Sequence, residues 1–153
     1  MDRPDPKGDL TSKIQRLEDL EQIRDLPRRY AHLVWQGKPV ETADLFTPDG
    51  IVDFGPNDGG LIQGREKLRE IYSEKVGADK MMLHPFVHNH IIDLTGDTAT
   101  GTVYIDLRCI KNGESLMGSG YYRDKYLRED GVWKFKERKL TMCYLVQSCQ
   151  GWI

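Results

Sequence analysis

The sequence lacks the features that mark several large classes of protein. Its 153 residues carry a net charge of −2, which provides no basic surface for a nucleic acid or an anionic membrane. No apolar run approaches the roughly 20 residues of a membrane-spanning helix. The three cysteines are odd in number and lack the paired spacing of a zinc site. We therefore expect a cytoplasmic protein with reduced thiols at Cys109, Cys143 and Cys149, and with neither a nucleic acid nor a membrane among its partners.

A pattern typical of a signal peptide is also lacking. Residues 1–11 are polar and include Pro4 and Pro6, so we interpret them as a flexible tail. Residues 12–153 have the length of one domain and contain neither a repeat nor a linker.

The first half of the chain has the periodicity of helices. Ser12 and Gln15 form a capping box ahead of apolar residues that recur every three or four positions until Gly37. Pro27 removes a backbone donor inside this stretch, so we expect a kink or a break just before it. Further helices are predicted over 39–46 and 65–76, with a strand over 51–54 between them.

The second half of the chain alternates with a period of two. Strands are predicted over 84–94, 98–111, 115–128 and 132–147, joined by turns at Gly96, Gly113 and Gly131. Helices followed by hairpins indicate an α+β fold, in which a curved antiparallel sheet wraps over the N-terminal helices as a cone-shaped barrel. The interior of such a cone is a common place for a small-molecule pocket. In the second of these strands, alternation places Leu107 on the face toward the helices and Asp106 on the opposite face.

Several short motifs occur in a characteristic order along the chain. They are Arg29-Tyr30-Ala31, the segment 43–50, the segment 64–68, the segment 84–89, the segment 96–101, and Tyr122-Arg123-Asp124 with the segment 130–135. In order and spacing these motifs resemble the nuclear transport factor 2-like superfamily, and within it the SnoaL-like group of dehydratases, cyclases and isomerases. The resemblance covers nearly the whole chain.

The resemblance implies a conical barrel with a deep apolar pocket and a homo-oligomer, either a dimer or a trimer. It implies chemistry without a cofactor, in which a proton is removed next to an activating group before a leaving group departs or a proton returns elsewhere. His84 matches the base of the dehydratase-like members, and Tyr30 matches a tyrosine that donates a hydrogen bond to the substrate oxygen. Tyr30 has an alternative interpretation as a core tyrosine.

The remaining residues of the expected substrate pocket fall into two groups. We expect Trp35, Phe54, Leu107 and Met142 to form its apolar wall. The resemblance implies further polar pocket groups, which are Asp106, Tyr122 and Asp124, and we add His88 as a possible partner of His84. For Asp106, the polar strand face also allows contact with solvent or with a second subunit.

Two positions depart from the pattern of the family. Trp35 stands where the relatives have the aspartate that orients the histidine. Phe54 stands where the isomerases have their base, and the adjacent Asp53 points to the other face of the strand. The partner of His84 is then Asp106, Asp124, Tyr122 or His88; alternatively its imidazole bonds to the backbone and caps a strand.

His88-Asn89-His90 suggests a metal site, because two histidines lie two residues apart. Only His88 and His90 can share a face, and no cysteine or acid is spaced to complete the ligand set, so we expect no metal. Asn89 fits a β-bulge. The leading hypothesis is a cofactor-independent proton-transfer lyase or isomerase, resembling a dehydratase or cyclase, that acts on a small apolar oxygenated substrate. The alternative is a non-catalytic domain for ligand binding or assembly.

Overall fold

A computed structural model describes residues 8–75 and 82–149. The helices are α1 (Leu10–Trp35), α2 (Pro39–Asp44) and α3 (Arg65–Lys75). The strands are β1 (Phe46–Asp53), β2 (Leu61–Gln63), β3 (Met82–Thr95), β4 (Thr98–Lys111), β5 (Glu114–Glu129) and β6 (Val132–Gln147). In these two ranges no helix has an apolar stretch long enough to cross a membrane.

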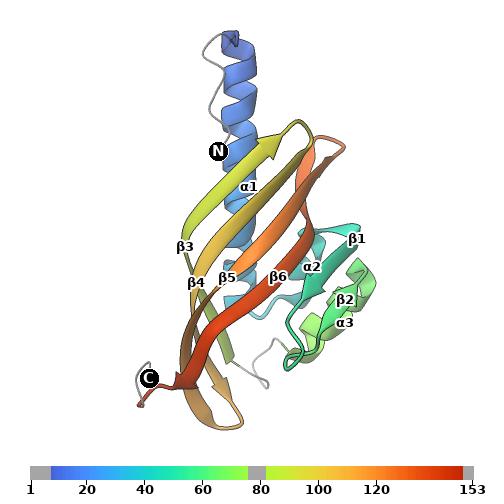
Figure 1. Ribbon diagram of the computed structural model, residues 1–153. Coiled ribbons are helices and arrows are strands. Elements are labelled where there is room, and N and C mark those ends of the chain that lie inside the picture. The colour runs from blue at the N-terminus through green and yellow to red at the C-terminus, as the bar shows by residue number, and fades with distance from the viewer. Residues whose placement is uncertain (1–7, 76–81, 150–153) are drawn as a thin grey trace.

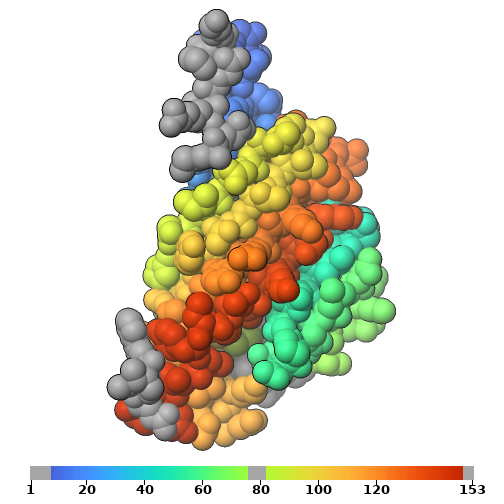
Figure 2. All heavy atoms as spheres, in the orientation of Figure 1, coloured from blue at the N-terminus to red at the C-terminus, as the bar shows by residue number. Residues whose placement is uncertain are grey.

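The strands form one curved sheet in the order β2-β1-β6-β5-β4-β3, with α1 running behind β3 to β6 (Figure 1). The predicted α+β fold, a curved sheet over N-terminal helices, is confirmed. The four long strands pair antiparallel as expected, but β1 pairs parallel with β6, so the sheet is mixed. It is also open, since β2 and β3 are its edges. Figure 2 shows that β3 to β6 form a broad face that the helices leave uncovered.

Helix α1 begins earlier than the sequence suggests. The side chain of Asp9 accepts a hydrogen bond from the backbone N–H of Ser12 at 2.7 Å, so Asp9 is the N-cap and Leu10 opens the helix. The other predicted tail residues, 1–7, lie outside the described residues. Pro27 does not break the helix, which continues to Trp35. The proline is itself buried, and we attribute the continuity of α1 to its packing against the sheet.

The hairpin turns follow the sequence prediction. Asn112 and Gly113 both have positive φ, at 53° and 78°, as a tight two-residue turn requires. The alternation within β4 is also confirmed, since Val103, Ile105 and Cys109 are buried, whereas Tyr104 and Arg108 between them are exposed.

Two irregularities change which face a side chain occupies. In β3 the pairing shifts between Val87 and His90, which supports the predicted bulge at Asn89. As a result His88 and His90 point to opposite faces, and the expectation that they could share one is wrong. In β6 the pairing shifts so that Lys136 is an extra residue, which turns Arg138 inward.

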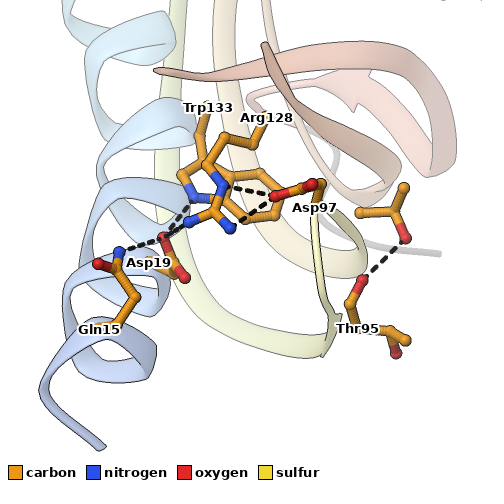
Figure 3. A network of polar contacts seen from close by, with 7 residues as sticks. Gln15, Asp19, Thr95, Asp97, Arg128 and Trp133 are labelled. Atoms are coloured by element: carbon orange, nitrogen blue, oxygen red, sulfur yellow. Dashed lines mark hydrogen bonds and ion pairs between the residues drawn. The ribbon is translucent and has the colours of Figure 1, made fainter. Parts of the chain in front are cut away.

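A polar cluster fastens α1 to the hairpin of β5 and β6 (Figure 3). The buried Asp19 carboxylate accepts hydrogen bonds from Arg128 Nη1 at 2.8 Å and from Trp133 Nε1 at 2.9 Å. Gln15 adds a third donor at 3.2 Å. Arg128 also pairs with Asp97 in the turn between β3 and β4. Because a buried carboxylate is stable only when bonded, this cluster fixes where the helix crosses the sheet.

Candidate functional site

A cavity of about 100 Å³ lies between the helices and the inner face of the sheet. Its wall is largely apolar, and it includes Val34, Phe54, Leu83, Leu107, Leu140 and Met142. At roughly 10–15 Å³ per water this volume holds several water molecules or a small organic ligand. An apolar wall with a few polar groups is typical of sites for small molecules.

Three tyrosines form the closed end of the cavity. Tyr30 of α1, Tyr72 of α3 and Tyr122 of β5 all line it, although they are only 4%, 2% and 7% exposed. The hydroxyls of Tyr30 and Tyr72 are 3.0 Å apart, and the ring of Tyr30 packs edge-on against the other two rings. The arrangement follows from the apolar stripes of the two helices and from the inward alternation of β5.

Burial determines the protonation of these tyrosines. Removal from water raises the pKa of Tyr30, Tyr72 and Tyr122 well above the ordinary value, because the phenolate would be poorly solvated. The three hydroxyls therefore stay protonated. One proton of the Tyr30–Tyr72 pair is used in the bond between them, so at most two of the three hydroxyls can donate to an oxygen in the cavity at once.

A buried ion pair supports the tyrosines from behind. Arg138 donates from Nε and Nη2 to the two oxygens of Asp124, at 2.8 and 2.9 Å, and both side chains are at most 1% exposed. The guanidinium carbon lies 3.8 Å from the ring centre of Tyr122 and 4.4 Å from that of Tyr30. Burial lowers the pKa of Arg138, but Asp124 more than offsets this and the arginine remains charged. A positive charge thus sits next to the closed end of the cavity.

The ion pair continues into a chain of hydrogen bonds that leads away from the cavity. Tyr126 donates to Asp124 at 2.9 Å, and its hydroxyl is 3.0 Å from Nε2 of His90. Burial lowers the pKa of His90 to about 4, helped by the positive charge of Arg138. His90 is therefore neutral at physiological pH.

The structure brings some of the expected pocket residues together. Tyr30, Phe54, Leu107, Tyr122 and Met142 line the cavity. We expected Asp124 to be a polar group of the cavity wall. It lies behind the tyrosines instead, where Arg138 and Tyr126 donate hydrogen bonds to its oxygens.

His84 and Trp35 lie outside the cavity wall. Leu83 and Pro85 line the cavity, so His84 between them points to the opposite face of β3. Its imidazole stacks on the indole of Trp35 with ring centres 3.7 Å apart, and Trp35 Nε1 donates to the carbonyl of Pro85 at 2.9 Å. In the relatives an aspartate at the position of Trp35 orients the histidine at the position of His84. Here the two side chains are also in contact, but as stacked rings. In the described part of the chain His84 has no hydrogen bond from its ring, and its role as base stays a prediction that this position does not support.

His88 and Asp106 occupy the outer face of the sheet instead of the pocket. Nε2 of His88 is 2.9 Å from Asp106, and Ser119 donates to the same carboxylate. The Ser119 bond, followed by the His88 contact, lowers the pKa of Asp106. Both residues are about half exposed, and the expectation that they face the pocket is corrected. Within 8–75 and 82–149 no group of three potential ligands could hold a metal ion.

Some residues of the site were not predicted. Tyr72 lies on the apolar side of a predicted helix, and this periodicity could have placed its side chain in the interior. Asp58, Lys75 and Lys111 line the open end of the cavity. Lys75 and Lys111 end an element and Asp58 lies in a loop, so no periodic pattern marks them. Strict alternation along β6 places the side chain of Arg138 on the outer face of the sheet, so the sequence pattern was misleading at this position.

The comparisons with known proteins place this geometry in a family. The SnoaL-like domain matches residues 15–139. A protein from Novosphingobium aromaticivorans, provisionally named a scytalone dehydratase, is 21% identical and superposes with a TM-score of 0.75 over 88% of this chain and 91% of its own. An NTF2-like protein with a cystatin-like fold from the same organism is 22% identical, with a TM-score of 0.76 and coverage of 90% and 92%.

A hexachlorocyclohexane dehydrochlorinase, LinA type 2, has the same fold. It is 19% identical, with a TM-score of 0.74 over 88% of this chain and 92% of its own. At such identities the three structures establish the fold, and the domain match establishes the family. The chain belongs to the family of SnoaL-like domains.

Proposed function

We propose that this protein is a cofactor-independent proton-transfer lyase or isomerase, dehydratase- or cyclase-like, acting on a small apolar oxygenated molecule in the cavity. The observation that carries the proposal is the set of three protonated tyrosines at the closed end of an apolar cavity, with the charge of Arg138 beside them. Relatives by fold include proteins named as a dehydratase and a dehydrochlorinase, which supports the reaction class.

The tyrosines suit the step that such reactions share. A base takes a proton from a carbon next to a carbonyl, and the electron pair of the broken C–H bond moves onto the oxygen. Donors already aimed at that oxygen stabilise the new negative charge strongly in a site that excludes water. The enolate then expels a leaving group or takes a proton at another carbon. Tyr30 and its neighbours would bind the oxygen, and His84 is the base that the resemblance implies.

Exchange of hydrogen for deuterium tests this proposal without knowledge of the natural substrate. Acetophenone in D₂O loses the proton NMR signal of its methyl group when a base removes those protons. We expect the wild-type protein to accelerate the loss, and Tyr30→Phe to reduce the acceleration, because the phenol stabilises the enolate. Since His84 lies outside the cavity wall, His84→Ala tests whether this residue takes any part in the exchange. His88→Ala, a histidine of the outer face, is the matched control. A folded His84→Ala protein that keeps the acceleration would remove His84 from the mechanism.

The second candidate is a non-catalytic domain for ligand binding or assembly. The stack of His84 on Trp35 favours it, because the ring has no acidic partner among the described residues and no place on the cavity wall. Asp58 is the carboxylate among the described lining residues, but it lies at the open end beside Lys111. Binding of acetophenone without accelerated exchange would select this candidate. A cytoplasmic location, a dimer or trimer, and chemistry without a cofactor remain predictions.

A further inference from the structure

The charged residues of the cavity gather at its open end. Lys75 is the last residue of α3, Lys111 is the last of β4, and Asp58 lies in the loop between β1 and β2. The side chains of Lys111 and Asp58 are 44% and 48% exposed, whereas the tyrosines of the closed end are buried. The cavity therefore has a polar mouth and a phenolic floor, with an apolar wall between them.

The residues described at the mouth carry more positive than negative charge. Nζ of Lys111 is 3.3 Å from the carboxylate of Asp58. The ammonium of Lys75 donates to the backbone carbonyl of Asp58 and lies 4.7 Å from the ring centre of Phe54. Among the described residues no carboxylate pairs with Lys75, so its charge is met by a carbonyl and an aromatic face. In the described lining of the cavity, two ammonium groups thus face one carboxylate.

We propose that the ligand of this cavity is a small apolar carboxylate with a carbonyl or hydroxyl oxygen at its other end. Its carboxylate binds Lys75 and Lys111 at the mouth, its apolar body fills the wall, and its second oxygen reaches the tyrosines. This inference rests on the proposed function, because it assigns the substrate class of the same site. The two lysines then determine specificity, and they take no part in the proton transfer.

The physical basis is the difference between charged and neutral hydrogen bonds. A bond from an ammonium to a carboxylate is about twice as strong as a neutral bond. Among the described residues Lys75 exchanges only neutral partners for the ligand, so there its gain is not cancelled by the loss of an ion pair. The attraction weakens as salt is added, because the mouth is open to solvent.

A pair of isosteric probes tests the inference. 4-Acetylbenzoate and 4-acetylbenzamide have the same shape and the same ketone, and differ in charge at the other end. We expect the wild-type protein to bind the acid roughly tenfold more tightly than the amide in low salt, as measured by NMR titration. Added sodium chloride should reduce this ratio and leave the affinity for the amide unchanged.

Variants locate the source of the preference. The double variant Lys75→Met with Lys111→Met should bind acid and amide equally, with the amide affinity of the wild type. Lys67→Met removes an exposed lysine of α3 away from the cavity and should keep the tenfold ratio. Equal affinity of the wild type for both probes would overturn the carboxylate inference and leave the proposed function standing. Failure of both probes, and of acetophenone, to bind would overturn the two together.

Discussion

Arg138 and Asp124 form an ion pair in the centre of the molecule, where water does not reach either side chain. Moving two charges out of water costs several kcal/mol each, and their attraction repays this only with good geometry. Here the two-point contact, the hydroxyl of Tyr126 and the rings of Tyr122 and Tyr30 supply that geometry. The pair also holds its positive member, the Arg138 guanidinium, against the rings of Tyr122 and Tyr30, whose hydroxyls we assign to the ligand oxygen.

Removal of one member of this pair should be costly. We expect Arg138→Met to lower the free energy of unfolding by about 3–5 kcal/mol, because it leaves the Asp124 carboxyl in the core without its partner. Urea denaturation measures the change. Arg108→Met, on the exposed outer face, should change stability by less than about 0.5 kcal/mol.

The double variant Arg138→Met with Asp124→Leu provides a further check on this account. It removes both charges and replaces them with apolar groups, so it should recover much of the lost stability. If the single and double variants are equally destabilised, the cost comes from packing and not from the unpaired carboxyl.

The lowered pKa of His90 predicts that the stability of the protein depends on pH. Its pKa falls from the ordinary 6.5 to about 4 on folding, first because of burial and then because of Arg138, Arg24 and Arg28. Between these values the unfolded chain binds the proton more readily, so stability is complete above pH 6.5 and declines as the pH falls toward 4. His90→Gln cannot take up the proton. The fall in unfolding free energy from pH 7 to pH 5 should be smaller in this variant, and an identical fall would refute the assignment.

At the scale of elements, α1 is held against the sheet by a polar contact as well as by apolar packing. Asp19→Ala removes the acceptor shared by Arg128, Trp133 and Gln15, and it leaves buried donors without partners (Figure 3). We expect a loss of about 2–4 kcal/mol in the free energy of unfolding.

Asp25→Ala is the matched control on the same helix, since Asp25 forms an exposed ion pair with Arg29. Such pairs contribute less than about 1 kcal/mol, so thermal unfolding should separate the two variants clearly. Equal effects would mean that the Asp19 cluster does not hold the helix in place.

Elements with strong local signals could be predicted from the sequence. The four long strands were found because their turns contain residues suited to positive φ, such as Asn112 and Gly113. Strand β2 was missed, because three residues carry too short a pattern. The start of β1 at Phe46 was also missed, since Pro48 and Gly50 are unusual inside a strand.

The faces of side chains were harder to predict than the strands. A bulge adds one residue and reverses the alternation beyond it, and the sequence of β6 does not show that Lys136 is that residue. Arg138, the charged residue closest to the tyrosines, was therefore missed. Tyr30 and Tyr122, which the resemblance places in the pocket, line the cavity and lie on stretches of chain without an extra residue. His84 and Asp106 were expected in the cavity from the resemblance, and their strand alternation placed them elsewhere.

At the scale of the whole molecule, the cavity is a product of the tertiary fold. Its floor joins α1, α3 and β5, and its mouth joins α3, β4 and the loop after β1. The sheet curves over the helices without closing (Figure 1), and the cavity between them opens where Asp58, Lys75 and Lys111 line it. Residues this far apart in sequence can share a site only when the curvature of the sheet and the position of α1 are both fixed.

The central claim is that the tyrosine floor binds the oxygen of a small apolar ligand. Titration of the protein with acetophenone, followed by NMR, tests it most directly in the wild type, in Tyr30→Phe and in Tyr104→Phe. Tyr104→Phe also removes one phenol hydroxyl, but from the exposed outer face of the sheet, and it serves as the control. We expect Tyr30→Phe to weaken binding by about tenfold and Tyr104→Phe to leave it unchanged. Equal affinities in all three proteins would show that the floor does not bind the oxygen, and would contradict the account.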